Sequence, residues 1–436
     1  MKDIIILGGG LSGISTAYFL QDKAEIRSIT ILEKEERAGG LCRSIKTGDY
    51  VYDIGPHILF SKDKEILQLL LDVLEDRNDL RRSNQICYKG RHIQYPFEND
   101  LSKLPEEELR YCIQSFNHNP YEEYEAENML QFFLKTFGEG ITNTYLRPYN
   151  EKIWKYDPSF MNTSMVDRIP KPTKEEIQRS AAGETIEGYL HQLYFHYPAN
   201  GGIEAVPQGF LKRLNSEKCR IEINQAVNRV KKEGEKYLVF TENGESFCAD
   251  TIISTIPVPL LACSYESCPE EIAQCAGNLR YNSIMIAFIK TPYDICGDHF
   301  TFTIPDSEVI FHRISKMDFL GNAYHHGDEA TFMAEITYRK NDYIDTLSGE
   351  ELLRKICSGM QQIGFAKEAG DVQLIDLTRH EYAYVIYDLH HKRNMEQIRN
   401  FFANENIILN GRFGNFEYWN MDRILRESLE ISRRFS

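Results

Sequence analysis

The sequence predicts an α/β fold in which a discontinuous, Rossmann-like nucleotide-binding domain carries an inserted helical domain and an antiparallel β-sheet domain. Three observations predict it. A glycine-rich turn follows an apolar run at the N-terminus, an apolar run ending "TIISTIP" is typical of a strand returning to the same sheet, and the segments between change from helical to alternating patterns. A chain of 436 residues is also too long for one ordinary core. The expected divisions are 1–80, 200–275 and 400–436 for the nucleotide-binding domain, 81–199 for a mostly helical substrate domain, and 276–399 for an antiparallel sheet substrate domain.

The N-terminal turn has the GxGxxG spacing of dinucleotide-binding proteins. The apolar run 4–7 is typical of a buried parallel strand, and Gly8, Gly10 and Gly13 follow it before a helical pattern. Gly8 permits the tight turn, Gly10 lets the backbone approach a pyrophosphate, and Gly13 lets the helix pack on the strand. The helix start, with Leu11 and Ser12, offers free N–H groups for phosphate.

A second apolar run ends at Glu33, about 20 residues beyond the last glycine of the motif. An acid at this position accepts hydrogen bonds from ribose hydroxyls and argues against a 2′-phosphate. Lys34 follows, and then come Gly39, Gly40 and Leu41, a second glycine pair that a simple NAD site does not need. Arg43 just beyond is suited to pairing with phosphate.

Composition narrows the class of protein. Apolar residues make up 42% and charged residues 26%, which indicates a soluble globular protein. The net charge of −15 disfavours nucleic acid and anionic membranes as partners. There is no apolar run long enough for a membrane span, and the start Lys2-Asp3 is unlike a signal peptide. The ten cysteines lack metal-ligand spacing, so we expect no metal site and a cytoplasmic location.

Further along, the patterns predict individual elements. They are a helix over 63–74, a hairpin over 86–97, mostly helices over 102–160 with an acidic stretch on a solvated helix face, alternating strands over 219–254, strands over 280–340, and helices over 350–362 and 422–433.

Residues 4–43 resemble the extended dinucleotide motif shared by FAD-containing amine oxidases, protoporphyrinogen oxidases and UDP-galactopyranose mutases. On this resemblance we predict FAD rather than NAD. Later segments, in order along the chain, are similar to the mutases. They are DIGPHILFS (53–61), YPFEND (95–100), RPYNEKIW (147–154), VDRIPKP (166–172), YPANGGIEAVPQGF (197–210) and NGRFGNFEYWNMD (410–422).

The resemblance implies two sets of site residues. The cofactor set is Gly8, Gly10, Leu11, Ser12, Gly13, Glu33, Lys34, Gly39, Gly40, Leu41, His57 and Arg412. The substrate set is Tyr95, Phe97, Glu98, Tyr149, Asn150, Trp154, Arg168, Arg313, Tyr384 and Tyr418, with Arg168, Arg313, His57, Tyr384 and Tyr418 in catalytic roles.

The chemistry suits these residue types. Arginine forks bind a diphosphate without a metal ion, and tyrosine hydroxyls add neutral donors. Tyr95 and Phe97 are expected to sandwich a base, and Tyr149 and Trp154 to line the sugar pocket. Alternatives stay open at two positions: Lys171 or Lys174 in place of Arg168, and Tyr387 in place of Tyr384.

The resemblance implies a mutase that interconverts the pyranose and furanose forms of a sugar nucleotide. It also implies a role in the biosynthesis of cell-surface polysaccharide. In such mutases N5 of reduced FAD attacks the anomeric carbon, forming a flavin–sugar adduct while UDP leaves. The implied partners are a nucleotide-sugar, an electron donor such as NAD(P)H or a reductase, and a second copy of the chain in a homo-oligomer.

Two departures from the mutase pattern keep the nucleotide open. Glu98 stands where the mutases place Gln or Asn beside the base, and two alternatives stay open: its carboxylate accepts from guanine or cytosine in place of uracil, or it faces water. Phe319 or Leu320 lies where some mutases have a phosphate-binding tyrosine. The rival functions are an oxidase of the amine or protoporphyrinogen type, and a flavoprotein that binds sugar nucleotides without catalysis.

Overall fold

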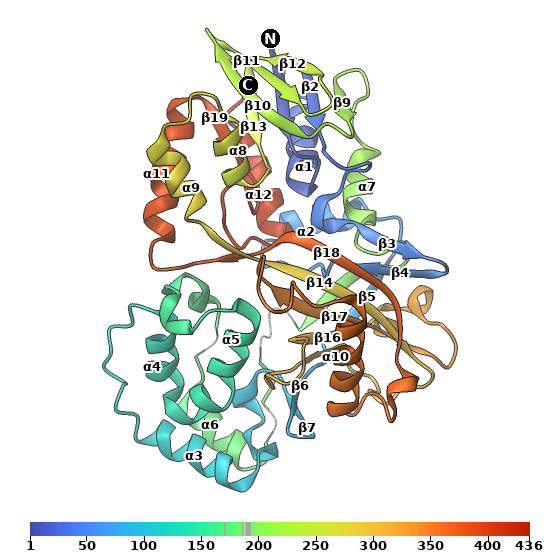
Figure 1. The fold of residues 1–436 in the computed structure, drawn as a ribbon, viewed down its shortest axis with the longest axis vertical. Helices are drawn as coiled ribbons and strands as arrows, with labels where there is room; N and C mark the ends of the chain where they lie inside the picture. The colour runs from blue at the N-terminus through green and yellow to red at the C-terminus, as the bar shows by residue number, and fades with distance from the viewer. Residues whose placement is uncertain (170, 185, 189–192) are drawn as a thin grey trace.

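The structure is a computed structural model that describes residues 1–169, 171–184, 186–188 and 193–436. It confirms the predicted α/β class, because a parallel sheet flanked by helices and a separate, largely antiparallel sheet are both present. Figure 1 shows the parallel sheet at the top, near both chain termini, and the second sheet below it.

The parallel sheet has the strand order β19-β13-β1-β2-β9. Its strands are β1 (Lys2–Leu7), β2 (Ile26–Leu32), β9 (Cys219–Glu222), β13 (Thr251–Ser254) and β19 (Ile407–Leu409). β13 pairs in parallel with β1 from Ile4↔Thr251 to Leu7↔Ser254. The prediction that this late strand rejoins the first sheet is therefore confirmed.

Helices from distant parts of the chain surround this sheet (Figure 1). They are α1 (Leu11–Leu20), α7 (Ala205–Leu211), α8 (Val258–Ser264), α9 (Glu270–Gly277), α11 (His391–Asn404) and α12 (Met421–Ser432). A buried polar network joins α1 to α12, because Ser15 Oγ donates to Ser428 Oγ at 2.9 Å and Asn410 Nδ2 donates to Thr16 Oγ1 at 2.8 Å. The segment after β19 is thereby held against α1.

Three small sheets and one further helix lie outside the two larger sheets. They are β10 (Val227–Glu233), β11 (Lys236–Thr241) and β12 (Ser246–Ala249); β3 (Ser44–Thr47) with β4 (Tyr50–Asp53); β5 (Arg77–Arg81) with β8 (Tyr194–Pro198); and α2 (Lys64–Asp72). The side chain of Asp63 caps α2 by accepting from Ile66 N, which agrees with the helix predicted there.

The large sheet has the order β18-β14-β17-β16-β15-β6-β7. Its strands are β6 (Asn84–Tyr88), β7 (Arg91–Gln94), β14 (Arg280–Thr291), β15 (Thr301–Thr303), β16 (Arg313–Lys316), β17 (Ala330–Tyr338) and β18 (Gln373–Ile386), with α10 (Gly349–Gln362) following β17. The predicted hairpin over 86–97 is confirmed, but it extends this sheet rather than joining the helices of 81–199, because β6 pairs in parallel with β15.

The helical region contains α3 (Glu106–Asn117), α4 (Met129–Ile141), the π-helical turn η4 (Thr142–Leu146), α5 (Arg147–Trp154) and α6 (Lys174–Ala181). The acidic stretch 122–127 is not helical, in contrast to the expectation. Asn128 caps α4 by accepting from Gln131 N, so the helix begins only after the acidic residues.

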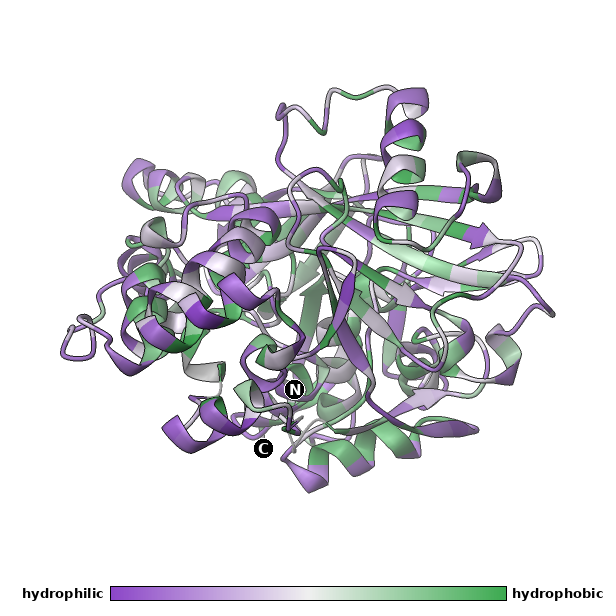
Figure 2. Ribbon diagram, turned by 90° about the horizontal axis from the view of Figure 1, so that it is seen from below, coloured by the Kyte–Doolittle hydropathy of each residue, from purple (hydrophilic) through white to green (hydrophobic). Residues whose placement is uncertain are grey.

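The buried core consists mainly of the apolar residues of the strands and of the inner helix faces. In Figure 2 apolar residues colour much of the central strands, whereas the surrounding helices carry bands of both hydrophilic and apolar residues. Within the described ranges, the helices lack the length and apolar character that crossing a bilayer requires.

Candidate functional site

One large cavity lies where the two halves meet, and we call it the central cavity. Its volume is about 1230 Å³, above the roughly 300–1,000 Å³ of most small-molecule sites. Residues after β1, β2, β13 and β19 line it, so the carboxyl ends of four parallel strands open into it. This edge of an open parallel sheet is where nucleotide ligands bind.

The β1–α1 turn forms one wall. Gly10 precedes α1 without a side-chain cap, and Leu11 and Ser12 of the first turn line the cavity. A Cβ added to Gly13 would lie 2.1 Å from the carbonyl oxygen of Gly8, so only glycine lets the helix lie this close. The free N–H groups of the helix start are therefore available to a phosphate.

The second glycine pair packs directly on the first loop. Gly39 N donates to Gly9 O at 2.8 Å, and a Cβ on Gly40 would lie 2.9 Å from the Cα of Gly10. Gly39 and Gly40 also have positive φ, which L-residues with side chains rarely adopt. This close packing and the positive φ angles are the physical reason for glycine at both positions.

Glu33 is buried at the end of β2 and lines the cavity. Its carboxylate accepts from the N–H groups of Gly9 at 2.7 Å and Glu35 at 3.0 Å. A carboxylate has about four lone-pair positions, so two backbone bonds still leave acceptor capacity for ribose hydroxyls.

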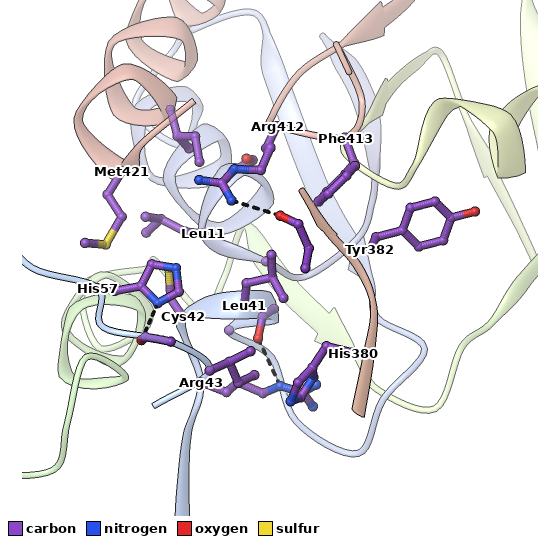
Figure 3. A pocket seen from close by; sticks show the side chains of 18 of the residues that line it. Leu11, Leu41, Cys42, Arg43, His57, His380, Tyr382, Arg412, Phe413 and Met421 are labelled. Carbon is purple, nitrogen blue, oxygen red and sulfur yellow. Dashed lines mark hydrogen bonds between the residues drawn. The ribbon is translucent and has the colours of Figure 1, made fainter. Parts of the chain in front are cut away.

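The loop of residues 54–60, which we call the His57 loop, also lines the cavity (Figure 3). His57 Nδ1 lies 3.1 Å from Gly55 O, and burial, followed by the charges of Arg412 and Arg313, lowers the pKa of His57 to about 4. The ring is therefore neutral at physiological pH, and an Nδ1–H donated to Gly55 O leaves Nε2 as an acceptor.

Buried Asp53 anchors the start of this loop. It accepts from Ser44 Oγ (2.6 Å), Tyr197 OH (2.6 Å) and Ile203 N (3.1 Å). Burial raises the pKa of Asp53 to about 6 in spite of these bonds.

Arg412 reaches the cavity from the segment after β19. Its Nε donates to Trp419 O at 2.9 Å and its Nη1 to Ala383 O at 3.2 Å, and the guanidinium lies 4.6 Å from the ring centroid of Tyr418. Figure 3 shows it above Leu11. Both of these hydrogen bonds go to backbone carbonyls, and among the described residues no carboxylate forms a salt bridge with Arg412, so its positive charge suits an anionic ligand.

Arg313 is held by a carboxylate that sequence analysis did not identify. Its Nε and Nη2 donate to Glu335 Oε1 and Oε2 at 2.5 and 2.6 Å, and Tyr384 OH donates to Glu335 Oε2 at 3.3 Å. Glu335 is fully buried, whereas the Arg313 side chain is 29% exposed. The bidentate pair orients one edge of the guanidinium and leaves the remaining N–H groups for the cavity.

Three rings form an aromatic cluster beside this pair. The rings of Tyr384 and Tyr418 lie nearly parallel at 5.9 Å, and Trp154 meets both edge-on at 5.7 and 6.2 Å. Trp154 is itself oriented by donating from Nε1 to Asn150 Oδ1 at 2.7 Å. Burial raises the pKa of Tyr384 well above its usual range, so its hydroxyl stays protonated.

A second aromatic stack does not match the expected base sandwich. Phe97 is completely buried and stacks on Tyr145 at 4.7 Å, and Tyr145 stacks on Tyr149 at 5.4 Å. Of these two residues, Tyr95 lines the cavity and Phe97 does not. The 3-10 turn η2 (Phe97–Asn99) directs Phe97 inward, so the structure does not bring Tyr95 and Phe97 together around an open slot.

The structure thus brings most of the predicted residues to one cavity. Those that line it are Gly8, Gly10, Leu11, Ser12, Glu33, Lys34, Gly39, Gly40, Leu41, His57, Tyr95, Arg313, Tyr384, Arg412 and Tyr418. Those that pack behind this lining are Gly13, Phe97, Glu98, Tyr149, Asn150 and Trp154. Arg168 ends the 3-10 helix η6 (Thr163–Arg168), and its side chain lies outside the described part of the chain.

Sequence reasoning missed two polar groups of the lining. Glu335 lies in a buried strand, and only its strand register opposite Arg313 reveals it. Asn84 lines the cavity, and its Oδ1 is buried without a hydrogen-bond partner among the described residues. No local motif marks either residue.

Comparison with known families identifies the class. Residues 11–395 match the model of the flavin containing amine oxidoreductase family, and the chain belongs to this family. The predicted superfamily is therefore confirmed.

The sequence identity to individual solved structures is low. The fold is that of a reduced UDP-galactopyranose mutase, with a TM-score of 0.91 over 100% of this chain and 93% of that chain at 22% identity. A putative protoporphyrinogen oxidase from Exiguobacterium sp. 255-15 has a TM-score of 0.76 at 17% identity, covering 99% of this chain and 98% of that one.

The curated relatives include proteins with different activities. The UDP-galactopyranose mutase of Mycoplasma pneumoniae is 22% identical over 65% of this chain and 66% of its own length. The L-amino-acid oxidase of Sistrurus catenatus edwardsii is 21% identical over 78% of this chain and 69% of its own length. The 1-hydroxycarotenoid 3,4-desaturase of Flavobacterium sp. is 29% identical over 33% of this chain, which spans only 30% of that protein.

The residues present fit a flavin dinucleotide. The glycine loops, the uncapped start of α1, the Glu33 carboxylate and Arg412 meet the demands of ribose and pyrophosphate within one cavity. The cavity also extends past His57 to Arg313, which leaves a second, cationic region for a substrate.

Proposed function

We propose that this protein is a flavin-dependent mutase that interconverts the pyranose and furanose forms of a nucleoside diphosphate sugar, with reduced FAD as its cofactor. The observation that carries the proposal is the fixed Arg313–Glu335 pair on the same cavity as the dinucleotide loop. An oriented arginine suits a diphosphate, and an oxidase acting on an uncharged substrate has no need of one. The similarity to UDP-galactopyranose mutases supports it.

In this proposal the chain's own residues bind and orient the substrate. Arg313 binds the diphosphate and stabilises it as a leaving group, together with Arg168. The hydroxyl of Tyr418 adds a neutral donor, and that of Tyr384, which donates to Glu335 in the structure, adds a second by turning to the diphosphate. Tyr149 and Asn150 support this region from behind the cavity lining. Trp154 covers the aromatic cluster and excludes water from the reacting sugar.

The cofactor residues hold the dinucleotide and tune it. Bound in reduced form, the flavin supplies a nucleophile that amino-acid side chains lack. Gly8, Gly10, Glu33 and Gly40 hold its pyrophosphate and ribose, while neutral His57 offers an acceptor at Nε2 and cationic Arg412 favours anionic flavin. Activity depends on an electron donor such as NAD(P)H or a reductase.

An oxidase remains the second candidate. The alignment with an L-amino-acid oxidase spans 78% of this chain, more than the alignment with the mutase. A near-parallel tyrosine pair such as Tyr384 and Tyr418 also suits an apolar substrate.

One experiment separates the two. The purified yellow protein is mixed anaerobically with UDP-galactofuranose, or with GDP- or CDP-sugars, with and without dithionite, and furanose and pyranose forms are resolved by chromatography. Conversion only in the reduced sample supports the mutase. Peroxide release in air from amines, amino acids or porphyrinogens, with no sugar conversion, supports the oxidase.

Arg313→Ala provides the internal comparison. It is expected to lose conversion, whereas Arg220→Ala on β9, whose side chain is 64% exposed, retains it.

A further inference from the structure

Tyr387 is a buried tyrosine that lies behind the lining of the central cavity. It directly follows β18, three residues beyond Tyr384, and an odd separation along an extended segment places two side chains on opposite faces. Tyr384 accordingly lines the cavity, whereas Tyr387 is 4% exposed, is not among the lining residues and belongs to the apolar cluster around β1, β13 and β19. Tyr387 is therefore not placed to bind a phosphate in place of Tyr384.

The hydroxyl of Tyr387 instead forms two hydrogen bonds with the segment that carries Tyr418. It accepts from the backbone N–H of Tyr418 at 2.6 Å and donates to Glu417 Oε2 at 2.7 Å. The other carboxylate oxygen of Glu417 accepts from Arg399 Nη2 of α11 at 2.6 Å. A tyrosine hydroxyl carries one proton, which here goes to Glu417, so its oxygen remains the acceptor for Tyr418. A chain of hydrogen bonds thus runs from α11 to a residue of the cavity lining.

This segment needs support because its backbone bends at Phe416. Phe416 is fully buried and has a φ of 51°, in the left-handed region that favours glycine. Such a conformation costs free energy and persists only where the surroundings hold it. His391 Nε2 donates to Phe416 O at 2.8 Å, and Arg399 Nη2 donates to Asn415 O at 2.9 Å. The direction in which Tyr418 leaves this bend therefore depends on the hydrogen bonds around it.

Tyr418 belongs to three contacts of the site at once. Its ring lies nearly parallel to Tyr384 at 5.9 Å, edge-on to Trp154 at 6.2 Å, and 4.6 Å from the guanidinium of Arg412. Each of these contacts depends on distance and ring orientation, so a shift of the Tyr418 backbone changes all three. The Tyr387 hydroxyl, by holding that backbone, acts on each of them.

The main chain of Tyr387 is itself fixed from the helical region. Its carbonyl oxygen accepts from Asn162 N at 2.8 Å, and Asn162 Nδ2 donates to Asp388 O at 2.9 Å. Asn162 also caps η6, the short helix that ends at Arg168. Tyr387 thus joins the segment before η6 to the segment after β19, and these two segments carry Arg168 and Tyr418.

We infer, building on the proposed function, that Tyr387 is a positioning residue for nucleotide-sugar binding. Its hydroxyl holds the backbone of Tyr418 so that the Tyr418 side chain meets the diphosphate. Glu417, paired with Arg399, holds the hydroxyl in turn. Tyr387 acts through Tyr418 and does not contact the substrate itself.

Nucleotide binding to single and double variants tests this role. UDP and GDP are titrated calorimetrically into the oxidised, flavin-loaded protein. Tyr387→Phe removes the hydroxyl and keeps the ring, and its affinity is expected to fall about three- to tenfold, as for the loss of one hydrogen bond. Tyr418→Ala removes the side chain through which Tyr387 acts. In that background Tyr387→Phe is expected to cause no further loss, because the two residues form one path.

A matched control separates positioning from a loss of stability. Tyr237→Phe on β11 also removes a buried hydroxyl, which donates to Glu405 O away from the cavity lining. Both variants are expected to melt at a lower temperature, but only Tyr387→Phe is expected to bind the nucleotide more weakly.

A second variant covers the case in which Tyr387→Phe yields no yellow protein. Glu417→Gln keeps an oxygen that accepts from the Tyr387 hydroxyl and removes the charge that pairs with Arg399. Its affinity for UDP or GDP is expected to fall by a smaller factor, and this loss is again expected to disappear in the Tyr418→Ala background.

The outcomes are distinct. Unchanged affinity in Tyr387→Phe, the same loss with and without the Tyr418 side chain, or wild-type affinity in Tyr418→Ala overturns the positioning role and leaves the mutase proposal standing. If the wild type binds neither UDP nor GDP, the proposed function and the inference both fail.

Discussion

Arg313 illustrates how much of the site depends on one pair of side chains. Its guanidinium is oriented by a buried glutamate from the neighbouring strand, and the same glutamate accepts from Tyr384. The guanidinium is planar and holds its N–H donors in a fixed geometry, so it supplies both charge and orientation. The ammonium group of lysine supplies only the charge.

Arg313→Lys is therefore expected to weaken nucleotide binding about 10- to 100-fold, which corresponds to the roughly 1.5–3 kcal/mol of a hydrogen bond to a charged group. Calorimetric titration of a nucleoside diphosphate measures it, with Arg220→Lys as the control. Equal affinities in the variant and the wild type would show that this arginine does not bind the phosphate.

Asp53 makes a pH-dependent contribution to stability. Its folded pKa of about 6 lies above the ordinary value of 3.8, so the folded state holds the proton more tightly than the unfolded chain. Its contribution is fully present only below the unfolded pKa of 3.8 and is lost as pH rises through about 6.

Asp53→Asn removes this dependence. The free energy of unfolding of the wild type, relative to the variant, is expected to fall by about 2.4 kcal/mol between pH 4 and pH 7. Denaturant unfolding at several pH values measures the difference. A constant difference across this range would contradict the assignment of the raised pKa to Asp53.

At the scale of elements, the β1–α1 unit depends on the missing Cβ of Gly13. Gly13→Ala is expected to abolish flavin binding, because the new methyl group meets the Gly8 carbonyl and displaces the helix start. The ratio of flavin to protein absorbance after purification measures the effect. Gly277→Ala at the end of α9, where a Cβ meets nothing within 4 Å, is expected to stay fully yellow.

Local elements could be predicted from sequence because their signals are local. The glycine spacing, the acid ending β2 and the hairpin around Lys89 each depend on neighbouring residues. The side-chain environment depends on distant partners instead. Glu335 faces Arg313 only through the register of β16 and β17, and Phe97 turns inward because Tyr145 from η4 offers it a ring.

At the scale of the whole molecule, the central cavity draws on segments scattered along the chain. The dinucleotide loop, the start of β10, the segment after β13, the end of β18 and the segment after β19 all contribute to it. A ligand bound there connects both sheets, and its binding energy adds to the stability of the entire fold.

Removal of the flavin is therefore expected to lower the melting temperature of the whole protein in one transition. Restoring FAD at 100 times its dissociation constant returns about 2.7 kcal/mol. Scanning calorimetry of stripped and reloaded protein measures this. A melting temperature that does not depend on FAD concentration would mean that the cofactor binds outside the cooperative core.

The placement of the two tryptophans has a practical consequence. The chain contains only Trp154 and Trp419. Trp419 lines the central cavity, and Trp154 lies edge-on to Tyr384 and Tyr418 of its lining. Tryptophan fluorescence of the intact protein therefore comes from the lining of the central cavity and the aromatic cluster beside it. Light absorbed by either indole can pass to a flavin bound beside it, so cofactor loading and substrate entry can be followed optically without any added label.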